Sequence, residues 1–215
     1  MNMLNDLKKR DTEKKIIFYQ PLELSGALNN QSGTVIRPKE LKKAFIASGY
    51  MIFDINGSIK DRVNLANNLI KNNSIEYMYV ESANIPMCIS NKKHWKVSFF
   101  ADLRLFYRAS KKMKIGIFYR DIHWKYKDYL KLIGIRKGII LKLLFYFEFF
   151  FIKKIFDYIF IPSSDFKKLL PNISGKAKYI PLPPAVNIKC KDRFLPTLNS
   201  IDILYSGIVS ISFLI

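Results

Sequence analysis

The chain of 215 residues has few cysteines and histidines, with 2 of each. Cys88 and Cys190 lie far apart, and neither has a potential metal ligand nearby at the spacing that zinc sites use. We therefore expect no metal site, no resident cofactor and no disulfide framework. Such cysteine usage is typical of a reduced, cytoplasmic protein.

Acidic side chains are also scarce. The chain has 17 Asp and Glu against 36 Lys and Arg, which gives a formal net charge of +19. Such an excess favours anionic partners, although the abundance of Lys, Ile and Asn points equally to a general compositional bias. A nucleic-acid-binding module is supported by the charge alone. No RNP, KH, zinc-finger or helix-turn-helix pattern is present in the sequence. We keep that module as an alternative and expect no nucleic acid partner.

Long hydrophobic runs are absent as well. The most apolar segment, "GIILKLLFYFEFFFIKKIF" (138–156), is interrupted by Lys142 and Glu148. Its uninterrupted runs fall short of the roughly 18 residues that a membrane-spanning helix needs. The pattern instead predicts a buried helix or one that lies on a membrane surface. Residues 1–14 lack the apolar region of a secretory signal, and we expect a disordered lead-in there.

Short apolar runs alternate with helical patterns along the chain. Strands are predicted at 15–21, 50–57, 75–82, 114–120, 157–163, 177–184 and 201–207. Helices are predicted at 37–49, 61–73, 99–113 and 164–171, with two more between the strands at 114–120 and 157–163. This order predicts an α/β fold: a Rossmann-like parallel sheet of about six strands with helices on both faces. We assign residues 15–186 to this domain, and residues 187–215 to a linker and the start of a second domain.

Charged residues follow the fourth predicted strand in "GIFYRDIHWKY" (116–126). Ligands of parallel sheets gather at the carboxyl ends of strands, where Arg120, Asp121 and His123 fall. Arg120 can hold an anion, Asp121 can orient a hydroxyl, and His123 can exchange a proton near neutral pH. Each residue alone is more often part of a structural ion pair or a cap, but the three together favour a functional site.

Two further sites follow the first and third predicted strands. A turn with Gly26, Ser32 and Gly33 leads into the helix near Arg37, and such helix N-termini can bind phosphate. An ordinary strand–helix loop explains the same glycines equally well. Glu81 ends the third strand, where its carboxylate can accept hydrogen bonds from sugar hydroxyls or serve as a cap or a solvated charge.

Several blocks resemble glycosyltransferases of the two-domain GT-B fold, in the family-four-like group. They are "SGTVIRPKELKKAFIASGYMIFDINGSIKDR", "YMYVESANIP", "IGIFYRDIHWKY", "FDYIFIPSSDFKKLL", "IPLPPAV" and "ILYSG". Their order and spacing carry the resemblance over roughly residues 15–208. It implies that this chain corresponds to the N-terminal, acceptor-binding domain of a retaining, nucleotide-sugar-dependent enzyme that needs no metal.

The resemblance also implies roles for single residues. Gly33 and Arg37 are expected near the donor phosphates, Asp121 and His123 at the catalytic position beside the donor sugar, and Glu81 and Arg120 on the acceptor side. The implied partners are a nucleotide-sugar donor and a glycan or lipid-linked acceptor. Synthesis of cell-surface polysaccharide or lipid-linked glycan would place the protein in the cytoplasm, at the anionic inner surface of the membrane.

The chain departs from that family after "ILYSG", where it continues "IVSISFLI" and stops. A donor-binding domain would be expected to follow. We therefore expect a fragment or a truncated reading frame that is inactive alone. The alternatives are a basic nucleic-acid-binding protein and a non-catalytic remnant.

Overall fold

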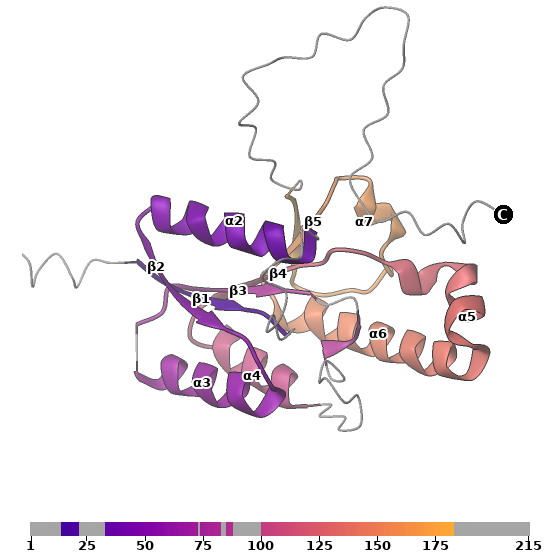
Figure 1. Cartoon of the computed structure of the whole chain (residues 1–215), viewed down its shortest axis with the longest axis horizontal. Helices are drawn as coiled ribbons and strands as arrows, with labels where there is room; N and C mark the ends of the chain where they lie inside the picture. The colour runs from indigo at the N-terminus through magenta and orange to yellow at the C-terminus, as the bar shows by residue number, and fades with distance from the viewer. Residues whose placement is uncertain (1–13, 22–32, 73, 83–84, 88–99, 183–215) are drawn as a thin grey trace, which may run out of the picture.

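A computed structural model describes residues 14–21, 33–72, 74–82, 85–87 and 100–182. Six strands form one parallel sheet in the order β2-β1-β3-β4-β5-β6 (Figure 1). They are β1 (Lys14–Tyr19), β2 (Tyr50–Ile55), β3 (Tyr77–Glu81), β4 (Lys114–Phe118), β5 (Tyr158–Ile161) and β6 (Lys178–Pro181). Every neighbouring pair is parallel. The predicted parallel α/β architecture is thereby confirmed.

Helices lie on both faces of this sheet, as predicted. Figure 1 shows α2 (Gly33–Ala47) on one face, and α3 (Ile59–Asn72), α4 (Ala101–Ser110) and α6 (Ile135–Ile155) on the other. The remaining elements are short: η2 (His123–Lys125), α5 (Lys127–Ile133) and α7 (Phe166–Leu169).

The two faces of the sheet have separate cores because side chains alternate along a strand. On the α2 side, Ile16, Phe18, Tyr79 and Phe118 are buried, with Leu41 and Phe45 of α2 against them. On the other side, the large core joins the strands to α3, α4 and α6; from the strands it includes Ile17, Tyr19, Met78, Val80, Ile115, Ile117 and Ile159. Apolar residues on both faces explain why the strands read as continuous hydrophobic runs.

The first helix differs from its predicted limits. The prediction began it at Arg37, but α2 begins at Gly33 and holds Pro38 inside it. Because proline has no backbone N–H, this helix gives up one internal hydrogen bond. The predicted strand at 201–207, the proposed second domain at 187–215 and the loop with Gly26 lie outside the described residues.

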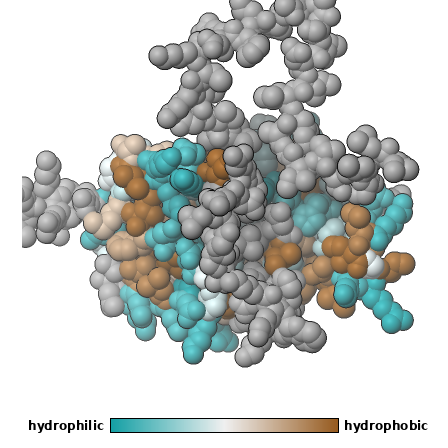
Figure 2. Space-filling model, in the orientation of Figure 1, coloured by the Kyte–Doolittle hydropathy of each residue, from teal (hydrophilic) through white to brown (hydrophobic). Residues whose placement is uncertain are grey.

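The apolar segment at 138–156 forms most of α6, which is buried on one side only. Phe145, Phe149 and Ile152 pack into the interior, whereas Ile139 and Leu143 are exposed. Figure 2 shows brown patches at both ends of the molecule, one of them where Figure 1 places α5 and α6. In the part of the chain that the structure describes, no helix is long and apolar enough to cross a membrane.

A buried charge network ties together the loops at the carboxyl ends of the strands. Arg62 of α3 is fully buried and pairs with Asp102 of α4, at 2.7 Å between Nη2 and Oδ2. Its guanidinium also donates to Tyr19 Oη at 2.9 Å and to the Pro21 carbonyl at 2.8 Å. Tyr19 Oη in turn donates to Asp102. The network therefore anchors the chain beyond β1 to two helices under the sheet.

Candidate functional site

The strand order changes direction at β1. This strand lies between β2 and β3, and the later strands add beyond β3 in sequence order. Ligands of open parallel sheets bind beside such a reversal, outside the carboxyl ends of the strands. Glu81 is the last residue of β3, and Arg120 and Asp121 follow β4 by two and three residues. The residues predicted from sequence therefore lie at the appropriate end of the sheet.

Three of the predicted residues form one ion cluster. Arg37 of α2 pairs with Glu81 Oε1, and it also donates to Tyr79 Oη at 3.0 Å. Tyr79 Oη donates to the same Glu81 oxygen at 2.9 Å. Arg120 approaches the other oxygen, with 3.7 Å between Nη2 and Oε2. The cluster thus links the first helix to the ends of two neighbouring strands.

The cluster is largely closed to solvent. The side chains of Arg37 and Glu81 are only 11% and 4% exposed, and the Arg37 guanidinium lies 3.3 Å from the centroid of the Phe118 ring. Burial raises the pKa of Glu81, and the Arg37 charge opposes that rise. Arg120, at 21% exposed, is the most accessible member. Arg37 and Glu81 therefore hold each other in place, and Arg120 has the most contact with solvent.

The backbone after β4 is fixed by the end of β3. Ser82 donates its N–H to the Phe118 carbonyl at 3.1 Å, and its hydroxyl accepts the Arg120 N–H at 3.1 Å. These two bonds extend the pairing of the strands by a residue beyond the sheet. The position of Arg120 is consequently set by both strands.

Asp121 and His123 form a second pair just beyond the cluster. The Asp121 carboxylate contacts His123 Nδ1, and both side chains are about one-third exposed, at 36% and 35%. The imidazole packs edge-on against the rings of Tyr129 and Phe145, with centroids 5.1 and 5.5 Å away. A carboxylate that accepts from Nδ1–H leaves Nε2 of a neutral imidazole as a hydrogen-bond acceptor. The pair can accept a proton from a ligand hydroxyl.

Family models, curated proteins and solved structures all give no match to this chain. The candidate site is therefore defined by the geometry of this chain alone, that is, by the strand reversal, the ion cluster and the Asp121–His123 pair.

Gly33 is the first residue of α2, one helical turn before Arg37. The predicted turn residues Gly26 and Ser32, which precede it, lie outside the described residues. Since α2 follows β1 along the chain, the N-terminus of α2 lies at the edge of the sheet formed by the carboxyl ends of the strands, where the Glu81 cluster also lies. The structure thus places all six predicted site residues at or just after the carboxyl ends of β1, β3 and β4.

Sequence reasoning missed a buried acid on α6. Glu148 accepts a hydrogen bond of 2.6 Å from the Met87 backbone N–H. Burial raises the pKa of this carboxyl to about 8, with a smaller contribution from the charge of Asp102. A single acid within an apolar run was the available signal, but the sequence analysis took Glu148 only as an interruption of that run.

Proposed function

We propose that this domain is the acceptor-binding half of a retaining, nucleotide-sugar-dependent glycosyltransferase. The observation that carries the proposal is the gathering of Arg37, Glu81 and Arg120 beside the strand reversal, with the Asp121–His123 pair next in sequence. Those residues were selected from sequence blocks that resemble the GT-B group. The ion cluster forms a rigid base, and Asp121 and His123 supply accessible polar atoms.

Each group has a chemical task in this proposal. Carboxylate and imidazole atoms suit sugar hydroxyls, because they accept hydrogen bonds at fixed positions. Arg120 supplies a cation on the acceptor side, where it can hold an anionic group of the acceptor. In the resembling family, a second domain holds most of the nucleotide. The described residues would then form one wall of the reaction site.

The proposal also places the domain at an anionic membrane surface. The outer side of α6 exposes apolar residues such as Ile139, Ile140 and Leu143, and the chain carries a net charge of +19. A helix with such a side can lie within the interface between headgroups and acyl chains. Binding to anionic vesicles should decline as salt rises, because salt screens surface charge. Flotation that is equal with neutral and anionic vesicles at all salt concentrations would contradict the electrostatic part.

The decisive experiment measures ligand binding by the chain itself. A panel of glycans, lipid-linked acceptors and nucleotide-sugars is titrated against the wild-type protein, an Asp121→Asn/His123→Ala variant and an Asp128→Asn control. Asp128 is an exposed acid on α5, so its substitution changes charge without touching the pair. We expect at least one acceptor or nucleotide-sugar to bind, with affinity lost in the double variant and kept in the control. Thermal melts establish that each variant is folded.

Two results would refute the proposal. One is the absence of binding to every acceptor and nucleotide-sugar in the panel. The other is unchanged binding in a folded Asp121→Asn/His123→Ala variant, which would show that the pair is structural. Transfer is assayed in parallel by mass spectrometry of the products. Where turnover is measurable, loss of one positioned polar group should lower kcat by on the order of 100-fold.

A further inference from the structure

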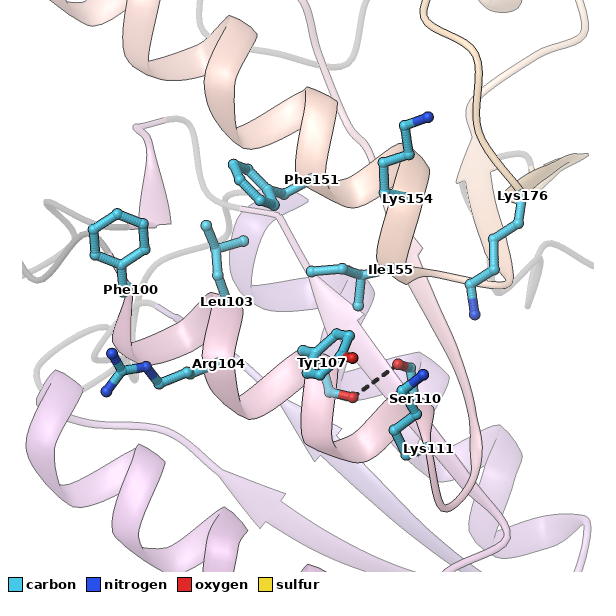
Figure 3. A pocket seen from close by; sticks show the side chains of 10 residues that line it. All are labelled: Phe100, Leu103, Arg104, Tyr107, Ser110, Lys111, Phe151, Lys154, Ile155 and Lys176. Atoms are coloured by element: carbon cyan, nitrogen blue, oxygen red, sulfur yellow. Dashed lines mark hydrogen bonds between the residues drawn. The ribbon is translucent and has the colours of Figure 1, made fainter.

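A groove separates α4 from α6 on the outer side of the helical layer. Its volume is about 470 Å³, within the range of roughly 300–1,000 Å³ that small-molecule sites occupy. Figure 3 shows its lining residues: one wall comes from α4, the other from the last turns of α6, and Lys176 closes one end. Both helices cover the face of the sheet opposite α2, so the groove lies on the other face from the Glu81 cluster (Figure 1).

The floor of the groove is apolar. Leu103 of α4 and Phe151 and Ile155 of α6 line it, and Phe151 and Leu103 pack against the main core. Two aromatic rings at its edge remain exposed, with Phe100 at 56% and Tyr107 at 54%. In Figure 3 the side chains of Leu103 and Ile155 face the space between the helices. An alkyl chain placed here would remove apolar surface from water on both sides.

The rim of the groove is cationic. Arg104, Lys111, Lys154 and Lys176 line it, and no acidic side chain does. Lys176 is paired with Asp157 at 3.1 Å. In the described part of the chain, the other three make no ion pair with a carboxylate; Lys111 lies 5.0 Å from the centroid of the Tyr107 ring. Uncompensated cations beside an apolar floor favour an anionic group at the rim.

Hydrogen-bond acceptors suited to a sugar are scarce in the groove, because no carboxylate or side-chain amide lines it. Its one aliphatic hydroxyl, on Ser110, donates to the Tyr107 carbonyl at 2.9 Å. A ligand rich in hydroxyls would lose its hydrogen bonds to water here and find few replacements. The chemistry of the groove therefore selects an apolar tail and an anionic head within one small molecule.

We propose that the groove between α4 and α6 binds a single-chain anionic amphiphile, with the alkyl chain on the apolar floor and the anionic head at the end where Lys111 and Lys154 lie. The site is separate from the proposed acceptor site, and neither depends on the other. Along α6 it lies in the last turns, whereas the exposed Ile139, Ile140 and Leu143 lie in the first half of the helix.

The test uses dodecyl phosphate below its critical micelle concentration, titrated into the chain by calorimetry. Dodecyltrimethylammonium and a dodecyl glycoside carry the same tail with a cationic and a neutral head. The groove variant is Lys111→Gln/Lys154→Gln. Its control is Lys131→Gln/Lys168→Gln, which removes the same charge from two exposed lysines outside the groove. A Tyr107→Ser variant shortens the apolar edge at an exposed position, where folding is little affected.

We expect dodecyl phosphate to bind at one site, more tightly than either matched amphiphile. The groove variant should weaken it by about tenfold, the scale of two solvent-accessible charge interactions, and the control should leave it unchanged. Tyr107→Ser should weaken all three ligands. Equal affinity for the cationic amphiphile, equal losses in the groove and control variants, or no binding of dodecyl phosphate to the folded chain would overturn the proposal. Binding to phosphatidylglycerol vesicles without binding of the monomer would assign the surface to membranes instead.

Discussion

Replacing Glu148 with glutamine should make the folded chain less sensitive to pH. The Glu148 carboxyl is buried against the Met87 N–H, and burial raises its pKa to about 8, from 4.5 for an accessible glutamate. Between these values the folded chain holds a proton that the unfolded chain has released. The free energy of unfolding must therefore fall as pH rises through this window.

The size of the effect follows from the width of the window. When one proton is bound only by the folded state, each rise of one pH unit lowers the free energy of unfolding by about 1.4 kcal/mol. From about pH 5.5 to about pH 7.5 the wild-type chain should thus lose roughly 3 kcal/mol relative to a chain with a permanently neutral side chain. Glutamine is such a side chain, and its amide oxygen can still accept from Met87 N–H.

The assay is urea unfolding of wild type, Glu148→Gln and a Glu76→Gln control across this range. Glu76 is exposed, so its substitution tests the general effect of removing an acid. We expect the Glu148→Gln chain to become progressively more stable than wild type as pH rises, while the control follows wild type. A constant difference between Glu148→Gln and wild type would refute the reasoning. So would a wild type that gains stability over the variant with rising pH, since this would mean that Glu148 is ionised in the fold.

Three further substitutions, at Arg62, Gly116 and Tyr77, test the buried interior. Arg62→Met should destabilise the fold by about 3–5 kcal/mol, because it leaves the Asp102 carboxylate buried without its cation; a loss below about 1 kcal/mol in urea unfolding would show that the pair is unimportant. Gly116→Ala should cost about 1–3 kcal/mol, because the new Cβ would overlap Tyr77 Oη and lie 2.7 Å from Phe160 Cε2. Tyr77→Phe alone should cost little, since the buried Tyr77 hydroxyl has no hydrogen-bond partner among the described residues. The double substitution should then be milder than the sum of the two; strict additivity would contradict the contact.

The sheet could be predicted from sequence because its strands are apolar on both faces. Runs such as "KIIFY" and "KIGIF" have no polar side, which is the pattern of buried parallel strands. The strand order could not be predicted, because it depends on the direction in which each crossover passes over the sheet. The start of α2 was predicted four residues too late, because Gly33 was assigned to the preceding turn.

The candidate site could be predicted only in part, because some of its contacts are local in sequence and others depend on how distant elements pack together. Asp121 and His123 lie two residues apart, so their contact is local and the sequence suggests it. Arg37 and Glu81 are separated by 44 positions, and each was selected for its place at a strand or helix end. Their ion pair depends on how α2 lies over β3. Arg62 and Asp102 gave no signal, since charged residues in helical patterns usually face solvent.

The strand order also determines how the sheet can grow during synthesis of the chain. β1 acquires its two neighbours from β2 and β3, both complete once Glu81 has been made. Each later strand then joins the free edge left by its predecessor, from β4 to β6. None of the six described strands has to be inserted between two that are already paired. A nascent chain that emerges from its N-terminus can therefore assemble these six strands in the order of translation, with β2 at one edge and each new strand after β3 added at the other edge.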